Sequence, residues 1–145
     1  MTGITVGFDG SHGAQRALEW AMREAGLHRA ALTVLAVHPV AISNWTGKPI
    51  TMPADQAAVE QTQEAATAAV AKAAAEVGES AAAEVTTRAV NGFPARELVA
   101  ASKDAGLIVL GSRGTNPFQR LLLGSVSGAV LHHAHCPVVV VPDDR

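Results

Sequence analysis

Five short stretches, each suited to one strand, alternate along the chain with four stretches whose apolar residues recur at helical spacing. The predicted strands cover residues 4–8, 32–37, 84–90, 107–110 and 138–141. A regular alternation of strands and helices is typical of a parallel sheet covered by helices on both faces. Because no internal repeat or change in composition divides the chain, we predict one α/β domain over residues 1–145.

Local capping signals place the helices between these strands. Ser11 can cap a first helix, and Gly26 is placed to end it. A second, Ala-rich helix is predicted over residues 55–76, and a third begins at Pro94. The fourth opens at about Ser125. Residues 40–54 show no period and are predicted to form a long loop, a type of segment that often serves as a lid or binding loop.

Composition excludes several classes of function. Hydrophobic residues make up 48% of the chain and aromatic residues only 3%, so the core must be aliphatic. The net charge is −2 and no basic cluster is present, which argues against a nucleic-acid-binding surface. No run reaches transmembrane length and no leader pattern opens the chain, so we expect a cytoplasmic protein without a membrane partner. The single cysteine, Cys136, has apolar neighbours and is predicted to be a buried, inert thiol.

A glycine-rich segment follows the fourth predicted strand. Gly111, Gly114, Gly124 and Ser125 have the spacing G-x2-G-x9-G-S, and the last two residues open a helix. Glycines let the backbone approach an anion, and a helix N-terminus offers unpaired N–H groups. Hydroxyls at Ser125 and Ser127 and positive charge from the loop would add to such a phosphate site; the loop arginines are Arg113 and Arg120. The alternative is that the glycines are turn residues and Ser125 is an ordinary N-cap.

Two residues at the end of the first strand are further candidates. Asp9 could contact a ribose or lie near a phosphate-bound metal ion, or it could form an Asx-turn or helix cap, which is the usual role of Asp-Gly-Ser. Gly7 lies where a larger side chain would block a crevice at the strand ends, although a glycine there could equally be a packing choice.

The motif resembles the nucleotide-binding signature G-x2-G-x9-G-[S/T] of the universal stress protein family, in its ATP-binding branch. The opening ITVGFDGS and the closing SVSGAVLHHAHCPVVVVP resemble that family as well, so the resemblance covers nearly the whole chain. It implies a doubly wound five-stranded parallel sheet of order 3-2-1-4-5. In that order the winding reverses between strands one and four, and a ligand is expected beyond their carboxyl ends.

The resemblance implies that the ligand is ATP or another adenine nucleotide, bound with Mg²⁺. The backbone of Val37 would meet the adenine edge, and Asp9 could reach the nucleotide-bound Mg²⁺. The residues do not distinguish ATP from AMP or cyclic AMP. The predicted binding residues are Gly7, Asp9, Val37, Gly111, Ser112, Arg113, Gly114, Gly124, Ser125, Val126 and Ser127.

No catalytic residues can be assigned from the sequence. It contains no Ser-His-Asp set, paired carboxylates or Walker lysine, and the histidines at 132, 133 and 135 show no metal-ligand pattern. We therefore expect a nucleotide-binding module of the stress response that acts as a dimeric switch. There are two alternatives: a slow ATPase or nucleotide hydrolase, and a dimerising scaffold with a vestigial site. Steady-state phosphate release would distinguish the enzyme, and nucleotide that co-purifies with the protein would argue against the scaffold.

The last predicted strand also suggests how the protein assembles. In the implied order it lies at a sheet edge, where unpaired backbone groups favour pairing with another strand. It is uncharged until Asp143 and consists of Val138, Val139, Val140 and Val141. Pairing with the same strand of a second copy would cover this edge, and the resemblance implies such homodimers. The alternative is that a loop or the C-terminal tail covers it.

Overall fold

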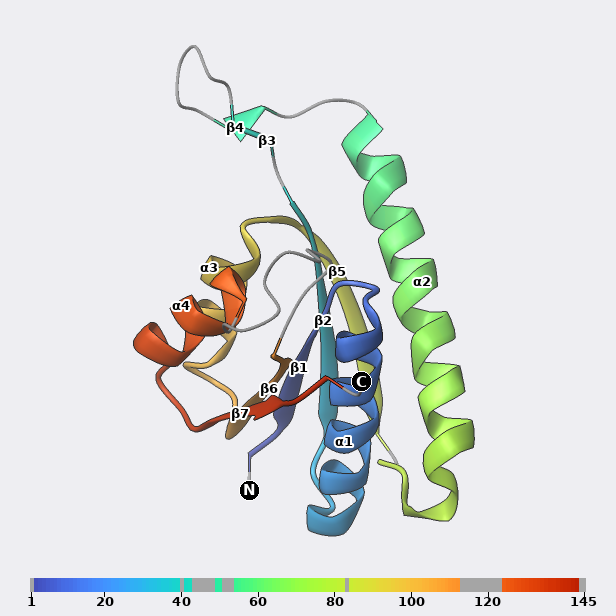
Figure 1. Cartoon of the computed structure of the whole chain (residues 1–145). Coiled ribbons are helices and arrows are strands. Elements are labelled where there is room, and N and C mark those ends of the chain that lie inside the picture. The colour runs from blue at the N-terminus through green and yellow to red at the C-terminus, as the bar shows by residue number, and fades with distance from the viewer. Residues whose placement is uncertain are drawn as a thin grey trace.

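Figure 1 shows the computed structural model of the protein, which describes residues 2–39, 41–42, 49–50, 54–82, 84–112 and 124–143. Its main sheet consists of β1 (Ile4–Phe8), β2 (Leu32–Pro39), β5 (Val85–Gly92), β6 (Leu107–Gly111) and β7 (Val138–Val141). The helices are α1 (His12–His28), α2 (Ala54–Val77), α3 (Pro94–Ala101) and α4 (Ser125–His133), and a 3₁₀ turn, η1, covers Gly78–Ser80. A second, two-stranded sheet pairs β3 (Ala41–Ile42) with β4 (Pro49–Ile50).

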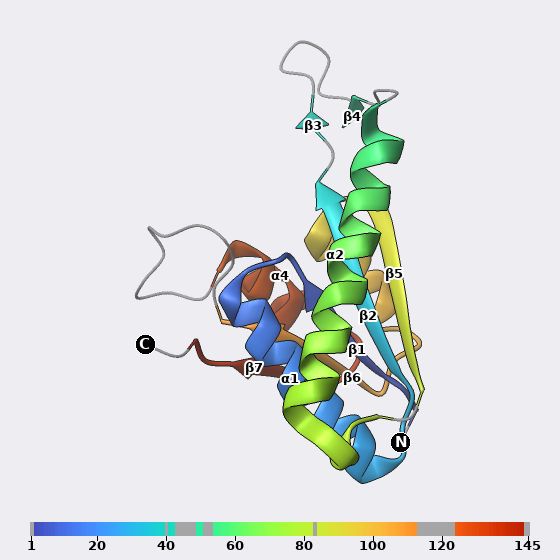
Figure 2. The ribbon, with the colours of Figure 1, turned by 90° about the vertical axis from the view of Figure 1, so that its right-hand side faces the viewer.

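The five strands are parallel and lie in the order β5-β2-β1-β6-β7. This confirms the predicted α/β fold with strand order 3-2-1-4-5. Ile4 of β1 aligns with Leu32 on one side and with Leu107 on the other, so the winding reverses between β1 and β6. Helices α1 and α2 cover one face of the sheet, and α3 and α4 cover the other (Figures 1 and 2).

Aliphatic side chains fill the core on both faces of the sheet. Leu18 and Met22 of α1 are fully buried against β1 and β2 on one face. On the other face, Leu98 of α3 and Val130 of α4 pack with Ile108 of β6. Strand β6 contributes residues to the core on both faces of the sheet, so it is buried on both sides. This explains why its sequence is a continuous apolar run.

Helix α1 begins as predicted but does not end as predicted. The Ala14 N–H donates to Ser11 Oγ at 3.1 Å, which confirms Ser11 as the N-cap. The helix continues past Gly26 to His28, and Arg29 caps it in the left-handed region with φ 51°. Gly26 has a packing role instead: a Cβ at this position would lie 1.8 Å from the Ser80 carbonyl oxygen of η1.

Two other segments differ from the prediction. Strands β2 and β5 extend together beyond their predicted ends because they pair with each other there, His38 with Asn91 and Pro39 with Gly92. Residues 40–54 were predicted as a loop, but they include the antiparallel pair β3–β4 and the first residue of α2. Two-residue strands are too short to produce an alternating pattern in the sequence.

Strand β7 lies at one edge of the main sheet, as predicted, and β5 lies at the other. Val138, Val139 and Val140 are half-buried, whereas Val141 is buried. None of the helices in the described ranges is both long enough and apolar enough to cross a membrane.

Candidate functional site

A cavity of about 530 Å³ opens at the carboxyl ends of β1, β2 and β6. Two segments far apart in the sequence form much of its wall, the turn after β1 and the start of α4. Eight predicted binding residues line it: Gly7, Asp9, Val37, Gly111, Gly124, Ser125, Val126 and Ser127. The structure therefore brings these residues together at the point where the sheet topology places a ligand.

The first turn of α4 presents backbone N–H groups at this cavity. Gly124 is the N-cap, with extended backbone angles of φ −59° and ψ 156°, and the first intrahelical bond runs from Gly128 N–H to its carbonyl at 2.9 Å. The N–H groups of residues 125–127 therefore have no partner within the helix. Ser125 is the first helical residue and its side chain is exposed, so the alternative prediction that it is the N-cap is wrong.

The Ser127 hydroxyl makes a hydrogen bond within the protein. The side chain is buried, and the hydroxyl donates to the Gly111 carbonyl oxygen at 2.7 Å. This bond joins α4 to the end of β6. Because a serine hydroxyl has one hydrogen to donate, the bond competes with the predicted donation to a phosphate.

Glycines at the strand ends allow close packing around the cavity. A Cβ on Gly111 would lie 3.0 Å from both the carbonyl carbon and the carbonyl oxygen of Gly13, so α1 begins directly against the end of β6. A Cβ on Gly7 would lie 2.8 Å from Leu110 and 3.2 Å from Leu98. Both leucines line the cavity, so Gly7 sets the depth of its apolar side.

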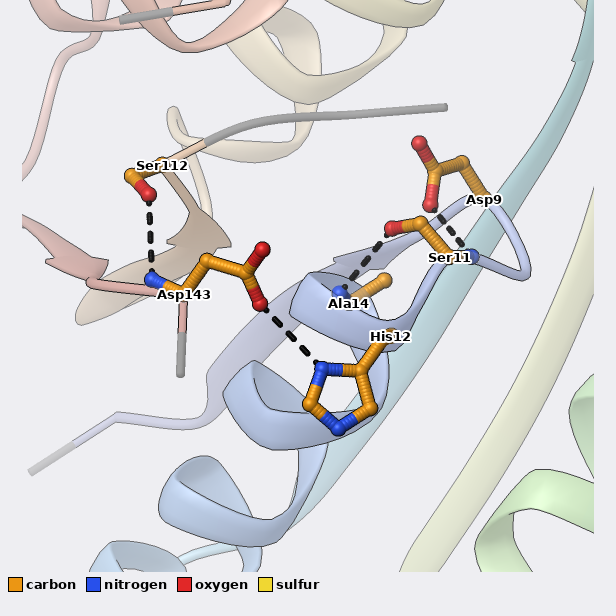
Figure 3. Close-up of polar contacts among 6 residues, drawn as sticks. All are labelled: Asp9, Ser11, His12, Ala14, Ser112 and Asp143. Carbon is orange, nitrogen blue, oxygen red and sulfur yellow. Dashed lines mark hydrogen bonds and ion pairs between the residues drawn. The ribbon is translucent and has the colours of Figure 1, made fainter. Parts of the chain in front are cut away.

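Asp9 forms the Asx-turn that the sequence offered as one alternative. Its Oδ1 accepts the Ser11 N–H at 2.9 Å (Figure 3). The other carboxylate oxygen, Oδ2, makes no hydrogen bond within the described part of the chain. Asp9 is exposed at the cavity wall, so one carboxylate oxygen holds the turn and the other can meet a ligand.

Ser112 is the one described residue of the predicted set that does not line the cavity. Its N–H donates to the Val141 carbonyl at 3.0 Å, and its own carbonyl accepts the Gly124 N–H at 2.9 Å. Its Oγ accepts the Asp143 N–H at 3.2 Å. Ser112 is thus hydrogen-bonded to β7, to the residue after it and to the start of α4.

The predicted residues Arg113 and Gly114, like Arg120, lie outside the described residues.

The sequence did not single out the apolar wall of the cavity. Leu35, Leu98 and Leu110 line it from the face covered by α3 and α4. Thr62 and Ala65 line it from α2, on the other face of the sheet. The leucines have the spacing of ordinary core positions, and the α2 residues belong to a uniform Ala-rich helix. No local signal could therefore have identified either group.

Cys136 and the histidines near the end of α4 add no reactive centre. Cys136 is half-buried rather than buried as predicted. Desolvation raises the pKa of its thiol, and a backbone hydrogen bond at Ile108 lowers this pKa by less, so the thiol stays protonated near neutral pH. Within residues 2–39, 56–82, 84–112 and 124–143, no group of three His, Cys, Asp or Glu side chains could hold a metal ion.

Comparisons with known proteins agree on one family. The model of the universal stress protein family matches residues 1–142. A universal stress protein of Mycolicibacterium smegmatis is 37% identical over 142 residues, which are 98% of this chain and 48% of that protein. The chain thus spans about half the length of the curated relatives that it matches.

Solved structures show the same fold. Universal stress protein UspA from Lactobacillus plantarum is 30% identical and superposes with a TM-score of 0.75, with 97% of each chain covered. A universal stress protein in complex with cAMP has a TM-score of 0.69 at 24% identity, covering 99% of this chain and 98% of that one. One from Archaeoglobus fulgidus in complex with dAMP has a TM-score of 0.65 at 24% identity, covering 97% of each chain. From its sequence and its fold, the chain belongs to the universal stress protein family.

Proposed function

We propose that this protein binds an adenine nucleotide in the cavity at the ends of β1 and β6 and acts as a nucleotide-responsive switch. The observation that carries the proposal is that one cavity combines the N–H groups of α4 that have no partner within the helix with an apolar wall. A nucleotide has the matching halves, a charged phosphate and a flat, largely apolar base.

The start of α4 suits the phosphate. Its N–H groups at residues 125–127 and the positive end of the helix dipole favour an anion there. Gly124 adds no side chain that would obstruct the approach. The proposal includes Arg113 and Gly114 as further parts of this cradle, on the strength of the motif alone.

The opposite wall suits the base and the sugar. Val37, Leu35 and Leu98 offer apolar surface to a ring. Asp9 is the only acidic residue lining the described part of the cavity, and its Oδ2 can accept a hydrogen bond from a ribose hydroxyl. If the ligand brings Mg²⁺, the ion would be held mainly by phosphate oxygens, and Asp9 would be the one carboxylate of the described lining that could add a ligand.

Two related structures support the choice of an adenine ligand. Proteins of the same fold are in complex with cAMP and with dAMP, both of which carry adenine and a phosphate. We propose binding rather than rapid turnover, because Asp9 is the one carboxylate of the described lining and its Oδ1 already holds the turn before α1. Rapid phosphoryl transfer needs a group that orients the attacking nucleophile.

Replacing Ser125 with alanine should weaken nucleotide binding by about 0.5–1.5 kcal/mol, or more if the lost hydrogen bond is to a charged phosphate. Ser125 is exposed in the first turn of α4, so the change should leave the fold intact. Titration calorimetry with ATP, AMP and cAMP, each with and without Mg²⁺, measures the effect and identifies the preferred ligand.

A matched control is Thr67→Ala, which removes a hydroxyl from an exposed position on α2 outside the cavity. It should not change nucleotide affinity. In the same titration, Gly114→Val should abolish binding if that glycine lets the loop backbone approach the phosphate. The proposal fails if folded wild-type protein binds none of these nucleotides, or binds them no better than Gly114→Val does.

We also propose that two copies pair through β7, antiparallel about a two-fold axis. Val140→Lys should then dissociate the dimer, because it places like charges across the two-fold axis. Val140 is the best position to test, since among the described residues Val138 and Val139 pack against the buried core and Val140 does not. Sedimentation measures the effect, with Thr86→Lys on the opposite edge strand β5 as the control. Wild-type protein that is monomeric at micromolar concentration would contradict this assembly.

A further inference from the structure

We propose that Asp143, just after β7, ties together the two rims of the cavity, so that nucleotide binding and the packing of residues 142–143 are coupled. The rims are defined as the α1 rim, residues 9–14, and the α4 rim, residues 111–112 with 124–127. The coupling rests on the proposed function, whereas the tie itself is a property of the protein without ligand.

The first contact of the tie is with the α4 rim. The Asp143 N–H donates to Ser112 Oγ at 3.2 Å, next to the bond from Ser112 N–H to the Val141 carbonyl. Ser112 in turn accepts the Gly124 N–H at 2.9 Å, and Gly124 is the N-cap of α4. The ends of β6 and β7 and the start of α4 therefore meet at this serine.

The second contact is with the α1 rim. Asp143 Oδ1 lies 3.2 Å from His12 Nδ1, and His12 is the first residue of α1 (Figure 3). Ser11, immediately before it, is bonded to Asp9 at the cavity wall. The Asp143 side chain is 26% exposed and that of His12 is 69% exposed. Because so exposed a pair adds little to global stability, its effect should be local: it positions one rim relative to the other.

Asp143 thus lies between the rims without lining the cavity. Its backbone contacts one rim and its carboxylate the other. A nucleotide held by Asp9 on the α1 rim and by the first turn of α4 would favour the same spacing of the rims. Nucleotide binding and the packing of Asp143 would then favour the same arrangement of the rims, so each would strengthen the other by the same free energy. Ser112, His12 and Asp143 are accordingly positioning residues, and Ser112 need not touch the ligand.

Single substitutions separate the two contacts. Asp143→Ala removes the carboxylate but keeps the N–H that binds Ser112, whereas Ser112→Ala removes the acceptor and leaves the carboxylate in place. Ser112→Thr restores a hydroxyl and should behave as wild type. Asp104→Ala, at an exposed aspartate after α3, is the control for loss of a carboxylate elsewhere.

The first measurement uses protein without nucleotide. Amide hydrogen exchange, followed by NMR, should be about tenfold faster at Asp143 in Ser112→Ala, because the hydroxyl that accepts the Asp143 N–H is lost. The Gly124 amide donates to the Ser112 backbone carbonyl, which the substitution keeps, so it serves as an internal reference. Ser112→Thr and Asp104→Ala should exchange at the wild-type rate. Unchanged exchange at Asp143 in Ser112→Ala would overturn the tie.

The second measurement adds AMP, or ATP with Mg²⁺. AMP should slow exchange at Asp143 in the wild type, and Asp143→Ala and His12→Ala should each bind AMP several-fold more weakly. The double variant His12→Ala, Asp143→Ala should bind AMP no more weakly than Asp143→Ala alone, since Asp143→Ala already removes the contact with His12. Fully additive losses, or exchange at Asp143 that AMP does not affect, would overturn the coupling.

These two measurements distinguish failure of the tie from failure of the proposed function. If the wild type binds neither AMP nor ATP, the proposed function fails and the coupling fails with it, while exchange without nucleotide still decides the tie. If Ser112→Ala weakens AMP binding but leaves exchange at Asp143 unchanged, Ser112 is a direct ligand and the tie is wrong.

Discussion

Replacing Gly26 with alanine should lower the free energy of unfolding by about 1–3 kcal/mol, the usual range for overpacking a filled site. The added Cβ would lie 1.8 Å from the Ser80 carbonyl oxygen and 2.9 Å from its carbon. Both are backbone atoms, so α1 and η1 must move apart to accommodate it. Alanine is a better helix former than glycine by about 1 kcal/mol, but this gain cannot offset so close a contact. Denaturant unfolding followed by circular dichroism measures the change.

The matched control is Gly128→Ala, which makes the same substitution inside α4. Among the described residues, a Cβ on Gly128 would meet nothing within 4 Å, so the helix preference for alanine should dominate. This variant should be more stable than the wild type by up to about 1 kcal/mol. The interpretation of Gly26 would be wrong if the two variants changed stability in the same direction.

Replacing Gly111 with alanine should weaken nucleotide binding more than tenfold, if the proposed function is right. The new Cβ would lie 3.0 Å from the backbone of Gly13, so the first turn of α1 must shift away from the end of β6. Asp9 and Ser11, which line the cavity just before that turn, would shift with it. The expected shift is a few tenths of an ångström. It misaligns groups that must contact one ligand together. Calorimetric titration with AMP or ATP measures the loss.

Gly128→Ala is again the control, since Gly128 does not line the cavity and no described residue would lie within 4 Å of its new methyl group. Its nucleotide affinity should stay within about twofold of the wild type, because nothing at the cavity changes. Thermal unfolding shows whether Gly111→Ala is still folded at the temperature of the titration. Wild-type affinity in folded Gly111→Ala would show that the close approach of α1 and β6 does not matter for binding.

Local patterns were sufficient to predict the helices and the strands of the main sheet, but not the short pair β3–β4. The apolar runs at residues 4–8 and 107–110 and the cap at Ser11 each depend on a few neighbouring residues, and the structure confirms them. The alternation of strands and helices then restricts the chain to a parallel sheet, since parallel strands need crossover connections. The family resemblance gave the strand order, and with it the position of the cavity.

Contacts between distant residues decided the rest. Gly26 was predicted to end α1, because no local pattern reveals its contact with Ser80, which lies far along the chain. Ser112 lies between two glycines of the motif, yet its side chain accepts the Asp143 N–H and does not line the cavity. Leu98 and Thr62 line the cavity although one resembles an ordinary core position and the other an ordinary helix surface. The sequence by itself determined which segments form the main sheet and the helices, and it predicted a phosphate site at the start of α4. Tertiary structure alone decided which side chains face the cavity, because that depends on how α1, α2 and α3 pack on the sheet.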